Sequence, residues 1–129
     1  MADATVTLNT CNVAIIPGTG RDFFASAYSA NWSTVGEVVA AVAKSTHYLT
    51  RIEVRTATAC TLTIGSGTGS DAVTTIHLGP VPMDAASGIF VWKAPKGYGL
   101  KMTSGTELAL ETSVEAPLWV YAEGFTAQN

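Results

Sequence analysis

Few residues in this sequence combine a reactive side chain with a spacing that chemistry could use. His47 and His77 are the two histidines of the 129-residue chain, and neither stands in an HxH or HExxH pattern that would bring two ligands to one metal ion. Histidines outside such patterns more often have a structural or surface role. Cys11 and Cys60 show no metal-ligand spacing, and the sequence leaves open whether they form a disulfide. We therefore expect neither a metal site nor a cofactor.

Two further motifs match catalytic sequences only in part. The segment GSGTG at residues 65–69 follows an expected strand, as a phosphate-binding loop would, but AVTTIHLGP after it is typical of a strand and not of a helix. Two late carboxylates, such as Glu107 and Glu111, could face one sugar as in a glycosidase. Alternation along the polar face of a hairpin explains both without catalysis. Since the sequence also lacks a G-x-S-x-G serine motif, it predicts that the protein is not an enzyme.

Composition excludes several classes of partner. Charged residues make up 13% of the chain, against about 25% in typical soluble domains, and the net charge is −3. No cationic patch can displace counterions from phosphates, so we expect no nucleic acid partner. The longest apolar run, residues 38–43, is far shorter than the ~20 residues of a membrane-spanning helix. MADATVTL at the N-terminus is not a secretory signal, so we expect synthesis in the cytoplasm and no membrane partner.

The elements that must position any site are strands. Thr, Val, Gly and Ser are abundant, and from Leu49 onward the hydrophobic period is close to two, as in CTLTIG at residues 60–65. The expected strands are 5–16, 48–56, 60–65, 73–78, 88–93 and 117–123. Breakers containing Gly and Pro separate them, and residues 79–82 are expected to end the strand over 73–78. Several short strands with turns at regular spacing predict one all-β domain, an antiparallel sandwich or barrel.

A hairpin is expected over residues 99–112, GLKMTSGTELALET. Apolar residues alternate with polar ones on both sides of a Ser-Gly turn. This pattern predicts one dry face and one wet face, with Glu107 and Glu111 on the wet face.

The first third of the chain is less regular. Residues 17–33 show no sustained hydrophobic period, although they contain four aromatic side chains. We expect an N-terminal strand and an irregular arm or loop over residues 1–34, followed by a β-sandwich domain over residues 35–129.

Residues 35–43 leave two structures open. Valines at helical spacing, with Thr34 and Glu37 as a possible capping box, fit a helix. The β-branched valines and Gly36 lower helix propensity, however. We favour a strand over residues 37–43.

Two expected strands carry apolar residues on both faces, whereas a sandwich strand needs only one such face. The aromatic members are Phe90, Trp92, Trp119 and Tyr121, and their aliphatic neighbours are Ile89, Val91, Leu118 and Val120. Leaving the aromatic side in water forfeits much of the ~25 cal/mol per Å² that burial provides. We predict that another subunit, the chain's own early segment or a ligand covers this side. The alternative is a β-bulge that turns all these side chains into a single core.

Three stretches carry a resemblance to a known family: LTRIEVRTATACTLTIGSG (49–67), TIHLGPVPMDAASGIFVWKAPKGYGLKMTSGTELALETS (75–113) and PLWVYAEGF (117–125). An apolar strand, a turn with Pro and Gly, a Gly-Leu-x-Met-Thr strand, a Ser-Gly turn, a Leu-x-Leu strand and an aromatic-rich strand follow in that order. This order resembles the small jelly-roll head decoration (cement) proteins of tailed bacteriophages. Tail-fibre knobs and trimers similar to tumour necrosis factor share the same texture.

The resemblance implies an antiparallel jelly-roll β-sandwich of about eight strands with no catalytic residues. It implies a homotrimer that binds the major capsid protein on the outside of the phage head, so the protein would belong to the virion. The aromatic second face would pack about the threefold axis, and the early aromatics would anchor an arm to the shell or form a plain covering loop. The interface residues expected on this basis are Phe23, Phe24, Tyr28, Trp32, Phe90, Trp92, Trp119 and Tyr121. The alternative is a tail-fibre or receptor-binding knob that recognises a host glycan or protein.

Overall fold

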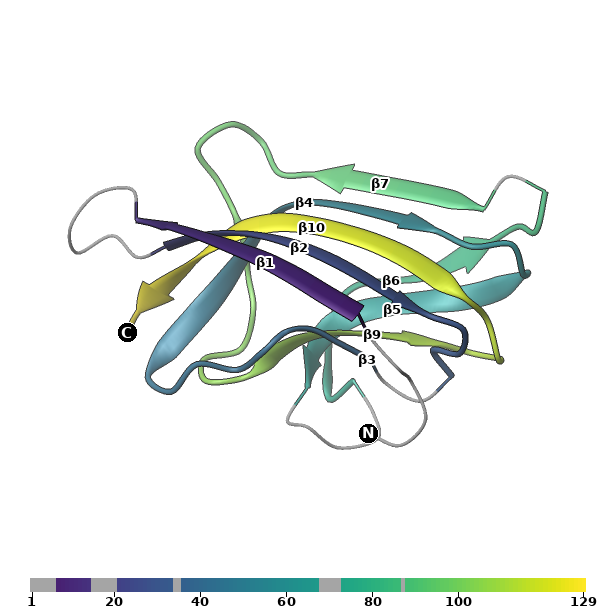
Figure 1. Cartoon of the computed structure of the whole chain (residues 1–129), viewed down its shortest axis with the longest axis horizontal. Coiled ribbons are helices and arrows are strands. Elements are labelled where there is room, and N and C mark those ends of the chain that lie inside the picture. Colours follow the sequence, from purple (N-terminus) through teal and green to yellow (C-terminus); the bar gives the residue numbers. More distant parts are fainter. Residues whose placement is uncertain (1–6, 15–20, 34–35, 68–72, 87) are drawn as a thin grey trace.

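The computed structural model describes residues 7–14, 21–33, 36–67, 73–86 and 88–129, with side chains from Asp22 onward, and these ranges contain ten β-strands and no helix (Figure 1). The strands are β1 Thr7–Ala14, β2 Arg21–Ser29, β3 Gly36–Val39, β4 Ser45–Arg55, β5 Cys60–Gly67, β6 Thr75–Met83, β7 Ile89–Lys93, β8 Leu100–Lys101, β9 Glu107–Thr112 and β10 Leu118–Gln128. The all-β class expected from the sequence is confirmed.

All strand pairs are antiparallel and belong to two sheets. The larger sheet has the order β1-β2-β10-β4-β7, with β8 also paired to β4, and the smaller has the order β3-β9-β5-β6. Buried residues of both sheets form one core, so the sheets face each other as in a β-sandwich, and Figure 1 shows the two layers. β10 lies in the middle of the larger sheet, between β2 and β4.

A β-bulge in the larger sheet interrupts the period of two. β4 turns both Leu49 and Ile52 into the core, and the register between β4 and β10 shifts between Glu123 and Gly124. The extra residue in β4 brings Leu49 and Ile52 to the same side. Glycine is needed at the shift because a Cβ atom on Gly124 would lie 2.1 Å from the carbonyl oxygen of Tyr48.

β4, β5, β7 and β10 lie where the period of two predicts strands, but two details of that prediction are wrong. Residues 79–82 do not end a strand, because β6 continues to Met83. Its register against β5 shifts twice between Leu62 and Gly65, and Gly79 takes a φ of 103°, so β6 passes these residues as an irregular edge strand.

The second wrong detail is the hairpin expected over residues 99–112, because its two strands do not pair with each other. β8 pairs with β4 in the larger sheet, whereas β9 pairs with β3 and β5 in the smaller one. The turn at Gly105, whose φ is 72°, joins two facing sheets. Both alternations are real, because Met102 and Leu108 enter the same core from opposite sheets. The prediction that Glu107 lies on the wet face is wrong, because Glu107 is 2% exposed in an inner strand of the smaller sheet.

The irregular arm expected over residues 17–33 is wrong for β2, which lies between β1 and β10. The side chains of β2 that point into the core are Phe23, Ala25, Ala27 and Ser29. Because most of them are small or polar while Phe24 and Tyr28 point outward, hydropathy does not alternate along this strand.

A strand is confirmed for part of residues 35–43, since β3 covers Gly36–Val39 and no helix forms there. It is shorter than the predicted strand over 37–43. Trp32, which is 0% exposed, packs so closely on β3 that a Cβ atom on Gly36 would lie 2.1 Å from its ring. Thr34 and the boundary between residues 34 and 35 lie outside the described residues.

Candidate interaction surface

The face of the larger sheet that points away from the core carries side chains of β2, β10, β4 and β7 in three rows, and we call it the outer face. The first row is Tyr28, Trp119, Arg55 and Ile89, the second is Ser26, Tyr121, Glu53 and Val91, and the third is Phe24, Glu123, Arg51 and Lys93. The residues between them along the strands, such as Val54 and Val120, are buried or half-buried, so the strand period separates the two faces.

Large apolar side chains are exposed at both ends of these rows. The exposed fractions are 39% for Phe24, 39% for Tyr28, 48% for Trp119, 56% for Ile89 and 51% for Val91. The rings of Tyr28 and Trp119 lie against each other, with centroids 5.1 Å apart and planes tilted by 36°. An aromatic pair held on two neighbouring strands in this way presents a rigid apolar surface to the solvent.

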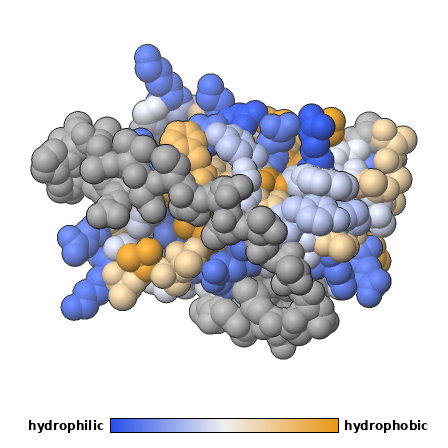
Figure 2. Space-filling view, viewed as in Figure 1, coloured by the Kyte–Doolittle hydropathy of each residue, from blue (hydrophilic) through white to orange (hydrophobic). Residues whose placement is uncertain are grey.

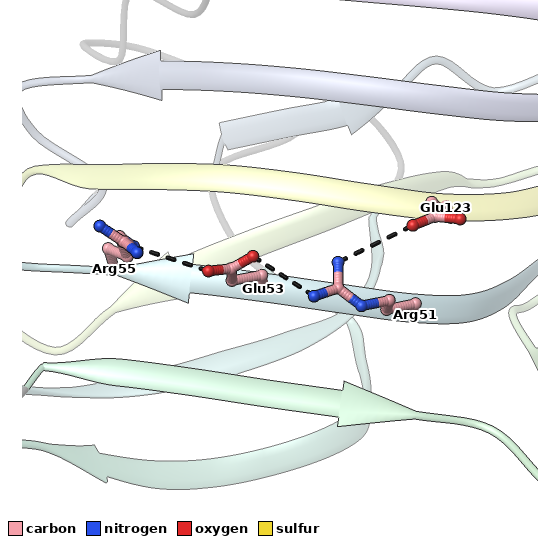
Figure 3. A network of polar contacts seen from close by, with 4 residues as sticks. All are labelled: Arg51, Glu53, Arg55 and Glu123. Atoms are coloured by element: carbon pink, nitrogen blue, oxygen red, sulfur yellow. Dashed lines mark hydrogen bonds and ion pairs between the residues drawn. The ribbon is translucent and has the colours of Figure 1, made fainter.

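A network of charges lies between the apolar ends of the outer face (Figure 3). Arg51 Nη2 lies 3.4 Å from Glu53 Oε2, Arg51 Nη1 lies 3.8 Å from Glu123 Oε2, and Arg55 Nε lies 3.6 Å from Glu53 Oε1. All four side chains are partly exposed, so each pair contributes only ~0–1 kcal/mol to stability. The four charges alternate in sign in the order Arg55, Glu53, Arg51 and Glu123.

Tyr121 joins the aromatic and ionic parts of the outer face. The guanidinium carbon of Arg51 lies 5.8 Å from the centroid of the Tyr121 ring, within the range of a cation–π contact. Reduced hydration, followed by the nearby Glu123 carboxylate, raises the pKa of the Tyr121 hydroxyl. This hydroxyl therefore stays protonated at neutral pH and can donate a hydrogen bond.

The outer face is hollowed beside the aromatic pair. An open hollow of about 390 Å³ is lined by Ser26, Ala27, Tyr28, Glu53, Arg55, Trp119, Val120 and Tyr121. A second hollow, of about 500 Å³, shares Arg55 and Trp119 with it and extends towards Ile89. In the view of Figure 2, hydrophobic residues form small groups between hydrophilic ones.

The structure divides the eight expected interface residues into two sets. Phe24, Tyr28, Trp119 and Tyr121 come together on the outer face. Phe90 and Trp92 pair with Val54 and Ile52 and are half-buried against the core, while Phe23 and Trp32 are 2% and 0% exposed. The aromatic residues of β7 and β10 thus point to opposite sides of the sheet, contrary to the expectation that they share one aromatic side. The alternative of one common core is wrong for Trp119.

The charged network was missed at the sequence level, although its signal is visible. Arg51, Glu53 and Arg55 stand at every second position of RIEVR, between the apolar residues Ile52 and Val54. Charges of alternating sign on one face of a central strand indicate a surface that is covered or organised by its neighbours.

His47 has a structural environment. Its ring lies 2% exposed in β4, with Nε2 2.7 Å from the Ala40 carbonyl oxygen and Nδ1 2.7 Å from Thr126 Oγ1. Since a carbonyl only accepts, Nε2 donates to Ala40 and Nδ1 accepts from the Thr126 hydroxyl. Burial lowers the pKa of His47, so the imidazole is neutral.

His77 meets a serine, but not in an accessible site. His77 Nε2 lies 2.9 Å from Ser66 Oγ, which also accepts a hydrogen bond of 2.9 Å from the backbone N–H of Thr103. Burial lowers the pKa of His77. Ser66 is 0% exposed, so a substrate cannot reach its hydroxyl.

The remaining groups offer little further chemistry. The thiol of Cys60 is free, and burial raises its pKa, while the side chain of Cys11 lies outside the described residues. Within the described ranges, no three His, Cys, Asp or Glu side chains lie close enough to hold a metal ion. No helix in those ranges is long and apolar enough to cross a bilayer.

No family model matches the sequence, and no curated protein matches it.

Proposed function

We propose that this chain is a non-enzymatic structural protein of a virion, a capsid decoration (cement) protein that binds the outside of a phage head and stabilises it. In this proposal it acts as a homotrimer and its partner is the major capsid protein. Binding across the joints between capsid subunits would favour the assembled shell by RT ln(1 + [L]/Kd).

The order of the strands supports the jelly-roll part of this proposal. In chain order, the strands from β2 to β10 alternate between the sheets, except at the β5-β6 pair and from β7 to β8. Each sheet combines early and late strands, with β2 beside β10 and β3 beside β9. This is the arrangement expected when two Greek keys fold into eight strands in two sheets, with β7 and β8 sharing one position and β1 added at the edge.

The outer face is the single observation that carries the functional proposal. It exposes Tyr28 and Trp119 as a packed pair, with Ile89 and Val91 at its other end and a network of alternating charges between them. Interfaces commonly combine aromatic anchors, arginine and a polar surround. A face of this kind suits permanent contact with another protein.

Incubation of the purified protein with undecorated phage heads tests the proposal. Imaging after incubation should reveal saturating, symmetric occupancy. Trp119→Ala should weaken binding at least 30-fold, which corresponds to a hot spot of about 2 kcal/mol. Ile76→Ala is the matched control, because Ile76 is 52% exposed on β6 in the other sheet. No binding at micromolar concentration would remove the proposal.

One observation favours a second function, a tail-fibre or receptor-binding knob. The hollow beside Trp119 combines an aromatic face with the carboxylate of Glu53 and the guanidinium of Arg55, which are the groups that bind sugar rings and their hydroxyls. Specific signals on a glycan array, lost in Trp119→Ala, together with no binding to heads, would favour the knob.

A further inference from the structure

β7 forms an edge of the larger sheet, and the direction of its free backbone groups can be derived. Its pairing with β4 is bounded by hydrogen bonds of 2.8 Å from the Ala94 N–H to the Thr50 carbonyl oxygen and from the Thr56 N–H to the Gly88 carbonyl oxygen. Alternate residues of an antiparallel strand turn their N–H and C=O groups to the same neighbour. Phe90 and Trp92 therefore bond β4, whereas the backbone groups of Ile89, Val91 and Lys93 point away from the sheet.

This edge lacks the features that usually prevent strands from pairing with other chains. β7 has the sequence IFVWK, keeps a continuous register with β4 and contains no proline. No strand of the described ranges pairs with its free side. The edge strand β6, by comparison, carries Pro80 and Pro82 and two register shifts. A regular apolar edge with one lysine is a site for strand addition.

The sequence of β7 is also complementary to that of a second, antiparallel β7 strand. When two β7 strands run antiparallel about a two-fold axis at Val91, Phe90 of one chain lies opposite Trp92 of the other on the core side. Ile89 then lies opposite Lys93 of the second chain, and Val91 opposite Val91. The residues that meet as hydrogen-bonded pairs are those whose backbone groups point outward, giving about six backbone hydrogen bonds. The aromatic pairs add cross-strand contacts and cover side chains that are half-buried in one chain alone.

We propose that the free edge of β7 is a self-recognition site, at which a second copy of this chain adds its own β7 to continue the larger sheet. The contact is isologous, since each chain offers the same strand. It goes beyond the proposed binding to a capsid and differs from the proposed threefold contact. Pairing would also bring the two outer faces side by side on one continuous sheet.

The mass of the particle in solution, measured by light scattering after size-exclusion chromatography, separates the two contacts. We expect an even multiple of the 13.4 kDa chain mass at about 100 µM: two chains from the β7 contact alone and six if the threefold contact also forms. One chain overturns both contacts, and three chains overturn the β7 contact while keeping the trimer. Failure to bind heads would affect only the capsid proposal.

Substitutions at the two-fold axis test the location of the contact. Val91→Pro removes an outward N–H without removing a bond to β4, and Val91→Lys places two like charges opposite each other. Each should halve the particle mass, whereas Val91→Thr keeps the N–H and should retain it. Circular dichroism and thermal unfolding check that each variant is folded. If a folded Val91→Lys keeps the full mass, the proposal is wrong, even if Val91→Pro does not fold.

Oxidative cross-linking gives a second readout. Directly opposed residues of a hydrogen-bonded pair have Cα atoms about 5.5 Å apart, within the range of a disulfide. Val91→Cys should therefore yield mainly disulfide-linked dimers. Ile76→Cys, equally exposed at 52% against 51%, should yield few, and the natural sequence controls for Cys60. Equal cross-linking at both positions would show random collision and overturn the proposal.

Discussion

The two faces of the larger sheet differ in what each residue contributes. Phe23 and Phe24 are neighbours in β2, yet Phe23 is 2% exposed in the core and Phe24 is 39% exposed on the outer face. β10 repeats the division, since Leu118 and Val120 are buried while Trp119 is 48% exposed. The inner face supplies the core that stabilises the fold, whereas the outer face keeps large side chains in contact with water. Three predictions test this division.

The largest effect is expected at Phe23. Phe23→Ala should lower the free energy of unfolding by ~3–5 kcal/mol, because it leaves a cavity among buried residues. Phe24→Ala should lower it by less than about 1 kcal/mol, because Phe24 is already 39% exposed and its loss leaves no cavity in the core. Urea denaturation of the two variants measures both values. Equal losses would contradict the division between the faces.

An intermediate effect is expected from acid. Because burial lowers the pKa of His47, the unfolded chain binds a proton at higher pH than the folded one. Stability is therefore full above the ordinary pKa of 6.5 and is lost as the pH falls below it.

Urea denaturation between pH 7.5 and 5 should reveal this slope. His47→Gln should remove most of it, whereas His77→Gln should remove less, since His77 is only half-buried and its pKa is lowered in the same direction. A slope unchanged in His47→Gln would mean that other groups cause the acid sensitivity.

The smallest effect is expected from the charged network. Glu53→Gln removes the carboxylate that lies between Arg51 and Arg55 and should cost only ~0.2–1 kcal/mol, an amount that decreases at high salt. Glu115→Gln, in an exposed loop, is the control. A loss of several kcal/mol at Glu53 would show that the outer face also stabilises the fold, and would weaken the comparison.

The sequence predicts the strands whose two faces differ strongly in hydropathy. CTLTIG and RIEVR show this difference plainly, and β5 and β4 lie where expected. β2 was missed because Ala25, Ala27 and Ser29 fill its inner positions, which leaves little contrast with the outer ones. The local sequence pattern therefore predicts the position of a strand only where its buried and exposed residues differ in type.

Which strands pair with each other could not be predicted from the local sequence pattern. The alternations around Met102 and Leu108 look like a hairpin, but they occur in two sheets that meet through the core. The same limit affected the site, because the side on which Phe90 and Trp92 lie depends on their pairing with β4. Neither fact is encoded in local periodicity, since both depend on contacts between distant segments.

The central position of β10 has a consequence for biosynthesis. A ribosome completes β2 and β4 well before it reaches β10, the strand that bonds both of them. Until then the nascent chain holds two separate pieces of the larger sheet, each with an unsatisfied edge. Closure of such distant segments is slow and exposes the chain to aggregation. The larger sheet is therefore completed only after β10 has been synthesised, and not while its earlier strands are being translated. Expression at low temperature or with chaperones should accordingly raise the soluble yield.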